Sequence, residues 1–405
     1  MLFLPHLLKR FIRKGRLVVI DHTGARHVFG SGEGGHSVTL RLGDARVERE
    51  IFFNPELKAA EAYMDGRLDF EEGSSVHDLL MLFAINREGL GAHPLQKALR
   101  RVWMSLRSRH QANPVSKVSD NASRHYDLSE EFYSLWLDES MTYTCAYFET
   151  PETPLAEAQL AKLRHVAAKL ALKPGMRVLE IGSGWGGLAI YLAKTCGVHV
   201  TGLNVSPRQL AESRRRAEAA GVGDRVAFVE QDYRIMEGAF DRIVSVGMME
   251  AVGIDYFDAY FGAIKRLLKP GGYGLIHCMG RMAPPGTTSP FIRKYIFPGG
   301  YVPSMSEVFA STERVGLWVS DCEFLRLHYY WTIKHWRQNF AAVRPKVVAM
   351  MGERFARMWE FYLSAVELGF LTGSNMVFQL LISAGRADVP VTRDFMFEEE
   401  ARLRG

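Results

Sequence analysis

Residues 178–187 read VLEIGSGWGG, an apolar stretch that runs into a glycine-dense turn. Residues 188–193 favour a helix, so the pattern predicts a strand, a tight loop and a helix in direct succession. Glycine allows a close approach of the backbone to a bound molecule and φ angles closed to other residues. The acid Glu180 comes at the end of the strand, and the free N–H groups of a helix N-terminus can receive a carboxylate. The stretch predicts a cofactor loop, although packing glycines produce similar patterns.

The spacing of the glycines separates this loop from two other nucleotide loops. It lacks the G-x-G-x-x-G spacing of a dinucleotide site and the G-K-[S/T] ending of a phosphate loop. The pattern Glu180-x-Gly182-x-Gly184-x-Gly186 instead resembles motif I of S-adenosylmethionine-dependent methyltransferases. The motif alone is a weak signal, so its meaning depends on the rest of the chain.

The composition is that of a globular protein with two domains. The 405 residues are 47% hydrophobic and 23% charged, with a net charge of +5. Basic residues gather in two stretches, 9–16 and 97–117, which suits anionic lipid or nucleic acid, but a solvated helix face explains them equally well. No run approaches the roughly 18 apolar residues of a membrane span. The four cysteines have no metal or disulfide spacing, so we expect a reducing, cytoplasmic setting.

The chain divides into two patterns. Apolar alternation at 17–20, 37–42 and 51–53 predicts strands, and residues 55–110 turn helical, which indicates a small α+β domain over 1–107. A polar stretch with Asn-Pro predicts a linker over 108–120.

Residues 121–405 form the second predicted domain, in which strands and helices alternate. We expect strands at 178–181, 198–203, 226–230, 240–246 and 274–277, helices at 188–194, 207–220 and 259–268, and a helical, aromatic-rich stretch over 335–385. Such alternation predicts an α/β fold with a mainly parallel sheet and helices on both faces. A ligand would bind at the carboxyl ends of the strands.

Polar segments follow the predicted strands where a binding crevice requires them. They occupy 204–209, 231–234, 245–253 and 277–281. Surface turns also carry polar residues, though rarely a Glu and a His that are both flanked by apolar residues.

Several segments in register carry a family resemblance. They are 125–129 (HYDLS), 141–148 (MTYTCAYF), 178–187, 231–234, 241–248 (DRIVSVGM) and 295–300 (YIFPGG). The chain resembles the cyclopropane-fatty-acyl-phospholipid synthases, densely over 120–385 and loosely over the first 110 residues. The related mycolic acid cyclopropane synthases share most of these motifs without the long N-terminal region. The resemblance implies a Rossmann-like class I methyltransferase domain preceded by the small α+β domain.

The resemblance also implies a reaction. A cis double bond in a phospholipid acyl chain attacks the methyl group of S-adenosylmethionine, which is held close to it. The resulting carbocation needs a dry pocket with apolar and aromatic walls, and the chain has 24 Phe, 15 Tyr and 7 Trp. A base then removes a proton from the new methyl group so that the ring closes. In the family this base is thought to be bound bicarbonate.

Matching motif to motif places four residues around the bicarbonate: Cys145, Glu250, His277 and Tyr329. Taken singly, Cys145 could be a buried small hydrophobe and His277 a core histidine. Tyr330 is a near-equal neighbour of Tyr329. Bicarbonate would accept the proton while Glu250 and His277 orient it through hydrogen bonds.

The resemblance implies the cofactor contacts as well. The predicted cofactor-binding residues are Tyr143, Thr144, Glu180, Gly182, Ser183, Gly184, Gly186, Asn204, Gln209, Asp232 and Tyr233. The glycine loop would hold the methionine part, Gln209 would reach the ribose, and Asp232 with Tyr233 would frame the adenine. No metal is implied.

Two positions depart from the family pattern. Ala251 stands where the family commonly has His after the motif glutamate, and Asn204 stands where Thr is frequent. Asn keeps its hydrogen-bonding capacity, whereas Ala251 removes a polar group. This leaves open a methyl-branched or methylene product from the same cation.

The implied partner is a phospholipid bilayer with unsaturated, anionic lipids. The basic residues at 9–16, beside apolar residues at 2–11, resemble an interfacial anchor, and Arg100–Arg109 is a second candidate contact. We therefore expect a cytoplasmic protein at the inner face of the membrane, and the family suggests a homodimer. A non-catalytic lipid-binding protein is the alternative from another class. A nucleic-acid methyltransferase is disfavoured because no Asn-Pro-Pro-aromatic motif occurs.

Overall fold

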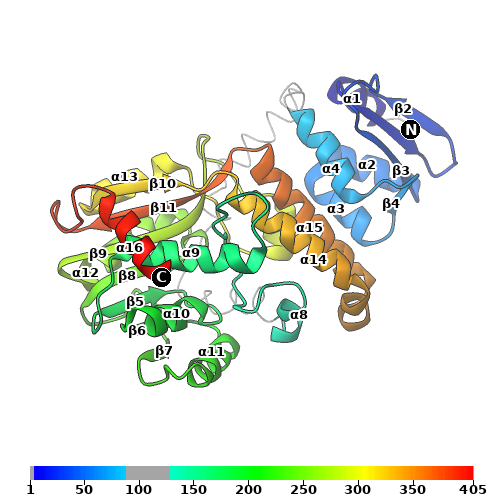
Figure 1. Ribbon diagram of the computed structural model, residues 1–405. Helices are drawn as coiled ribbons and strands as arrows, with labels where there is room; N and C mark the ends of the chain where they lie inside the picture. The colour runs from blue at the N-terminus through cyan, green and yellow to red at the C-terminus, as the bar shows by residue number, and fades with distance from the viewer. Residues whose placement is uncertain (1–3, 88–127, 405) are drawn as a thin grey trace. The chain divides into compact units, whose positions relative to one another are not determined.

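The computed structural model describes residues 4–87 and 128–404, which form two compact units (Figure 1). The first unit contains residues 4–87 with Thr287–Ile296 and Ile333–Ser374, and the second contains the other described residues. The predicted linker at 108–120, the basic stretch at 97–117 and residues 125–127 of the motif at 125–129 lie outside the described residues.

A four-stranded sheet forms one layer of the first unit. Its strands, in the order β2-β1-β3-β4, are β2 (Arg26–Phe29), β1 (Arg16–Ile20), β3 (Ser37–Leu42) and β4 (Leu68–Glu71). β1 and β3 are parallel and the other pairs are antiparallel. The strands predicted at 17–20 and 37–42 are confirmed. The strand predicted at 51–53 is wrong, because the carboxylate of Asp44 caps a helix, α2 (Ala45–Phe53), that includes these residues.

Helices from early in the chain pack on this sheet, and further helices from late in the chain belong to the same unit. They are α1 (Leu4–Phe11), α2, α3 (Pro55–Met64), α4 (Val76–Ile85), residues 333–351 of α14 (His328–Met351), α15 (Glu353–Leu371) and a π-helical turn at Ile292–Ile296. α15 packs against α3 and α4, and the Tyr63 hydroxyl donates a 3.0 Å hydrogen bond to Glu360. Residues 287–296 and 333–374, which the sequence placed with the catalytic domain, thus group with the N-terminal unit.

The second unit is built on a seven-stranded sheet. In spatial order its strands are β10 (Trp318–Phe324), β11 (Asn375–Ser383), β9 (Leu268–Arg281), β8 (Phe240–Val246), β5 (Arg177–Ile181), β6 (His199–Asn204) and β7 (Val226–Glu230). The strands from β9 to β7 are parallel, which confirms the predicted sheet, and β11 is antiparallel to both neighbours. The helix predicted over 335–385 is wrong for β11, an apolar run buried on both faces.

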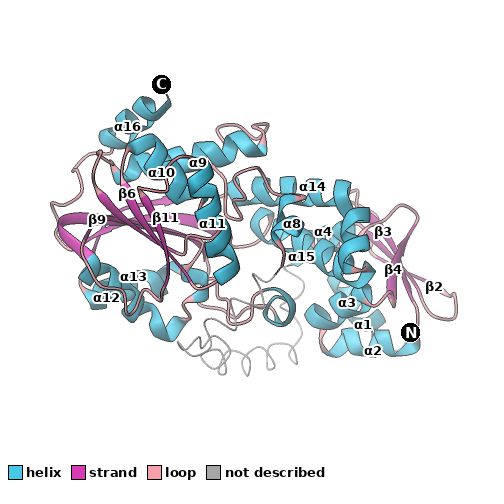
Figure 2. Cartoon of the chain, turned by 90° about the horizontal axis from the view of Figure 1, so that it is seen from below, coloured by secondary structure: helices cyan, strands magenta, loops and turns pink. Residues whose placement is uncertain are grey.

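Helices lie on both faces of this sheet, as predicted. They are α9 (Leu155–Leu170), α10 (Gly187–Cys196), α11 (Pro207–Ala219), α12 (Phe257–Leu267), α13 (Met305–Val315) and α16 (Asp394–Arg404). The unit also contains α8 (Glu130–Ser134) and the short 3₁₀ turns Met249–Ala251 and Ile254–Tyr256. Figure 2 shows α9, α10, α11 and α16 on one face and α12 and α13 on the other. Each face has its own apolar core.

The carboxyl ends of β5 and β8 form a topological switch point, which is where open α/β sheets have their ligand crevice. The chain runs from β5 outward to β6 and β7, then returns to β8 on the other side of β5. The glycine loop after β5 enters this crevice with φ of +86° at Gly182 and +81° at Gly186. A Cβ atom on Gly186 would lie 2.7 Å from the Phe228 ring, so only glycine fits there.

Candidate functional site

Glu180 and Ser183 present polar atoms without partners at the crevice. Glu180 is buried at the end of β5, and its Oε2 has no hydrogen-bond partner. The Oγ of Ser183 is likewise buried and unpartnered. Burial raises the pKa of Glu180, while the charge of Lys162 and a backbone N–H of Ala189 lower it. An orphaned carboxylate oxygen in a buried loop fits a ligand that carries a positive, hydrogen-bonding group.

Asn204 and Gln209 support the glycine loop through hydrogen bonds. The Asn204 amide donates to the Gly184 carbonyl and to Gln209 Oε1, both at 3.0 Å. Its oxygen accepts hydrogen bonds from the N–H groups of Val205 and Ser206. Both ends of the Asn204 side chain are therefore already used within the protein. Its predicted contact with the cofactor stays a prediction, and the structure gives it a supporting role.

Asp232 and Tyr233 follow β7, two strands away from β5. Burial alone would raise the pKa of Asp232, but a bidentate pair with Arg234, at 2.8 and 2.5 Å, lowers it. The Tyr233 ring meets Tyr260 edge to face at 5.4 Å. Asp232 is thus an ionised acceptor in a fixed orientation, which suits the predicted contact with a nucleoside.

The segment with Tyr143, Thr144 and Cys145 is aligned along one face of α9. Gln159 Nε2 donates to the Thr144 carbonyl at 3.0 Å, and Lys162 Nζ donates to the Thr144 hydroxyl at 2.9 Å. Gln159 and Lys162 are three residues apart and therefore share a helix face. This face brings the segment to the crevice, where a Cβ on Gly247, directly after β8, would lie 2.8 Å from Thr144.

Cys145 lies beside the first turn of α14. Its thiol is buried and donates to the Ala146 carbonyl at 3.3 Å, and burial raises its pKa strongly. The next N–H group, of Ala146, donates to Thr332 on α14 at 3.0 Å. On the same turn Tyr329 is buried and Tyr330 is half-buried. The structure therefore brings Cys145 and the predicted tyrosine turn together.

Glu250 lies in the 3₁₀ turn after β8, and His277 lies within β9 opposite Val246, the last residue of β8. Glu250 Oε1 accepts a 2.7 Å hydrogen bond from the Met279 N–H on β9, and its Oε2 is buried without a partner. Burial raises the pKa of Glu250 and lowers that of His277. His277 is therefore held in its neutral form and can donate a hydrogen bond from its one ring N–H.

Gln379 is a site residue that the sequence analysis missed. It lies directly opposite His277 on β11, and its amide donates to His277 Nδ1 at 3.1 Å. The proton of the neutral ring is then on Nε2, which is buried and has no partner. The signal available in the sequence was a single amide within the apolar run MVFQLLI at 376–382. Lys162 is the second missed residue.

These contacts show what the two sides of the crevice can bind. The His277 Nε2–H is a neutral donor that suits a small anion such as bicarbonate, and the Cys145 thiol and the Glu250 carboxyl, whose pKa values burial raises, are the other predicted members of this side. The other side, with Glu180, Ser183 and the glycine loop, suits a polar cofactor with an amino group. Among the described residues, no group of three or more His, Cys, Asp or Glu side chains could hold a metal ion.

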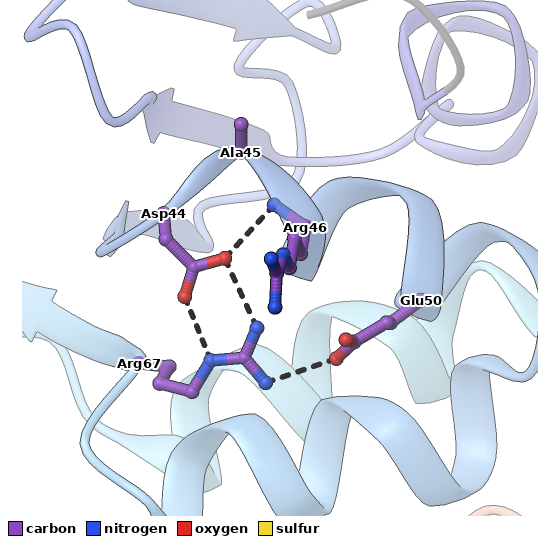
Figure 3. A pocket seen from close by; sticks show the side chains of 5 residues that line it. All are labelled: Asp44, Ala45, Arg46, Glu50 and Arg67. Atoms are coloured by element: carbon purple, nitrogen blue, oxygen red, sulfur yellow. Dashed lines mark hydrogen bonds and ion pairs between the residues drawn. The ribbon is translucent and has the colours of Figure 1, made fainter.

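A polar pocket in the first unit has the opposite character (Figure 3). Asp44, Ala45, Arg46, Glu50 and Arg67 line it. Arg67 donates to both oxygens of Asp44, at 2.7 and 3.0 Å, and to Glu50 at 3.0 Å. These charged groups satisfy one another and cap α2, so they explain a local fold rather than a ligand site.

The fold and the crevice define the class of protein first. Five parallel strands with the glycine loop at the switch point, and an acid before it, are those of an S-adenosylmethionine-dependent methyltransferase. The sequence profile of the mycolic acid cyclopropane synthetase family matches residues 114–380, and the chain belongs to this family.

The relatives with assigned activities include both a cyclopropane synthase and a fatty acid methyltransferase. The chain is 37% identical over 354 residues to the cyclopropane-fatty-acyl-phospholipid synthase of Escherichia coli K12, covering 84% of this chain and 88% of that protein. It is 40% identical over 272 residues to the tuberculostearic acid methyltransferase UfaA1 of Mycobacterium tuberculosis, covering 64% of each. The solved structure of the mycolic acid cyclopropane synthase CmaA1 with SAH and CTAB is 30% identical. Its TM-score is 0.63, and the match covers 67% of this chain and 99% of that one.

Proposed function

We propose that this protein is a cyclopropane-fatty-acyl-phospholipid synthase that converts the cis double bond of an unsaturated phospholipid acyl chain into a cyclopropane ring. The observation that carries the proposal is a set of buried polar atoms without partners near the carboxyl ends of β5 and β8: Glu180 Oε2 on the cofactor side, and Glu250 Oε2 and His277 Nε2 on the other. The similarity to the E. coli enzyme over most of both chains supports the substrate class.

On the cofactor side, the protein would bind and orient the cofactor and exclude water from it. S-adenosylmethionine would supply an electrophilic methyl group on a positive sulfur. The glycine loop admits it closely, and Glu180 accepts hydrogen bonds from its amino group. Tyr143 packs against Tyr133 at 5.4 Å and Trp136 at 5.6 Å, and Tyr133 reaches Trp185 in the glycine loop at 6.1 Å. These rings keep water from the crevice and can face a cation.

On the opposite side, the residues hold the proposed base. Bicarbonate would accept the proton that the new methyl group loses. His277 presents Nε2–H to it because Gln379 occupies Nδ1, and Glu250 presents its free Oε2. Tyr329 would complete the set. The neutral His277 thus orients the base through a donor that does not compete for the proton.

The membrane contact that we propose is electrostatic. In α1 the apolar residues Leu4, Leu8 and Phe11 are buried in the first unit, so this face cannot insert into lipid as an interfacial anchor. The basic residues at 9, 10, 13, 14 and 16 remain exposed and can meet anionic head groups. None of the described helices is long and apolar enough to cross a membrane. We propose a dimer that acts at the inner face of the membrane.

Vesicle sedimentation tests the membrane contact. We expect stronger binding to vesicles with anionic lipid than to neutral ones at low salt, and loss of this preference at high salt because the charges are screened. Equal binding to both kinds of vesicle at low salt would contradict the electrostatic contact.

A methyl-branched or methylene product is the second candidate. UfaA1 is named as a methyltransferase and shares 40% identity with this chain over 272 residues. Ala251, where the family pattern has His, lies at an exposed position directly after Glu250. The same cation could therefore lose a different proton and leave no ring.

The deciding experiment uses vesicles of cis-unsaturated phospholipid and labelled S-adenosylmethionine. NMR of the recovered acyl chains is needed, since cyclopropane and methylene products have the same mass. We expect ring protons. A methyl branch or a methylene group would instead establish the second candidate, and no transfer of label would leave a non-catalytic lipid-binding protein. Full activity in Cys145→Ser or Glu250→Ala would refute the assignment of the base site.

A further inference from the structure

Two buried lysines on α9 differ in their partners. Lys169 forms an ion pair with Glu323. Lys162 is only 2% exposed, yet its ammonium lies within 4 Å of no carboxylate in the described part of the chain. Its hydrogen bond goes to the Thr144 hydroxyl at 2.9 Å. Because an ammonium without a counter-charge is costly to bury, Lys162 calls for a functional explanation.

The charged and titratable groups around Lys162 belong to the proposed site. Its charge acts on Asp138 in the loop after α8, on Cys145, on Glu180 at the end of β5 and on His277 of β9. One oxygen of Glu180 and one of Asp138 are buried without a hydrogen-bond partner. Lys162 is thus the cation that faces both halves of the crevice from α9.

We propose that Lys162 is a positioning residue for the cofactor: its buried ammonium places a positive charge at the site where Glu180 receives the amino group of S-adenosylmethionine, while its hydrogen bond to Thr144 holds the Cys145 segment at the same site. The inference rests on the proposed use of S-adenosylmethionine but not on the lipid reaction.

The electrostatics explain why the charge is needed. Burial raises the pKa of Glu180, and the nearby ammonium counters that rise. Burial also lowers the pKa of Lys162, and the acids around it counter that fall. Without Lys162 the buried Glu180 would hold its proton to a higher pH, and a protonated carboxyl binds an ammonium group poorly.

The test measures binding of S-adenosylhomocysteine by calorimetry from pH 5.5 to 8.5, so it requires no lipid. For the unchanged protein we expect affinity to rise with pH as Glu180 ionises. In Lys162→Met the rise should move upward by about one pH unit or more, which lowers the affinity at pH 7 about ten-fold. Lys162→Arg should restore the profile, since it keeps the charge. Lys169→Met is the matched control, a second buried lysine on the same helix, and should keep the rise at its original pH.

Two results would overturn the inference. One is a folded Lys162→Met protein whose affinity rises at the original pH. The other is Glu180→Gln with an unchanged rise, because the titrating group would then lie elsewhere. Glu180→Gln also serves if Lys162→Met does not fold, since it replaces an unpartnered oxygen with a neutral amide. Normal binding with no lipid product would contradict the proposed function and leave the role of Lys162 intact, so the two failures are distinguishable.

Discussion

The polar cluster around Arg67 and the crevice at the end of β5 use similar residues for different purposes, one to support the local fold and one to bind a ligand. In the cluster both oxygens of Asp44 and one of Glu50 are bonded to Arg67, so the charges satisfy one another (Figure 3). In the crevice Glu180 and Glu250 each keep one buried oxygen without a partner. Unsatisfied buried groups cost stability, and a protein retains them where a ligand completes them. Charge alone therefore does not mark a site, whereas a missing partner does.

The largest effect should come from Glu250→Gln. The new amide can still accept the Met279 N–H through its oxygen, so the melting temperature should hold. The carboxyl on the base side is lost, and we expect turnover to fall by about 100-fold or more. Steady-state kinetics measures turnover, and calorimetry with S-adenosylhomocysteine measures cofactor binding. Weaker cofactor binding at unchanged turnover would move Glu250 to the cofactor half.

Glu323→Gln tests a partnered acid in the same unit. Burial alone would raise the pKa of Glu323, but His165 and Lys169 outweigh it and lower the pKa to about 2. Its stabilisation is therefore present above the unfolded value near 4.5 and is lost as pH falls toward 2. We expect the substitution to cost about 2 kcal/mol at pH 7 and to flatten the acid limb of stability. Denaturant unfolding at several pH values measures this, and cofactor affinity should not change.

Gln379→Leu and Gln379→Glu separate orientation from packing. Leu leaves His277 Nδ1 without its donor, so the ring can place its proton on either nitrogen, and we expect about ten-fold lower turnover. Glu would accept a hydrogen bond from Nδ1–H and raise the pKa of His277. The pH optimum of activity should therefore shift. An unchanged pH profile in Gln379→Glu would show that Gln379 only fills space.

Asp44→Ala should have the smallest effect. Loss of the cap of α2 should destabilise the first unit by about 1 kcal/mol. Binding of S-adenosylhomocysteine should stay the same, which denaturant unfolding and calorimetry together check. A change in lipid turnover beyond the loss of folded protein would show that the Arg67 cluster does more than support the fold.

The fold of the catalytic half could be predicted because its strands and helices are local patterns. The strands after the glycine loop are apolar runs bounded by polar turns, and their order follows from βαβ connectivity. Residues 51–53 were misassigned because the cap at Asp44 outweighs their preference for strand. β11 was misassigned because its apolar run, next to two long helices, looks the same in a helix or a buried strand.

By itself, the sequence determined the parallel sheet and the glycine loop, and through its resemblance to known synthases it predicted the residues on both sides of the crevice. Motif spacing is local information, and the glycines and Glu180 carry it within ten residues. Only the tertiary structure decided which polar atoms lack a partner. That property depends on contacts such as Lys162 with Thr144 and Gln379 with His277, which bring together residues that lie 18 and 102 positions apart. The pairing of distant residues is set by packing, and no local pattern encodes it.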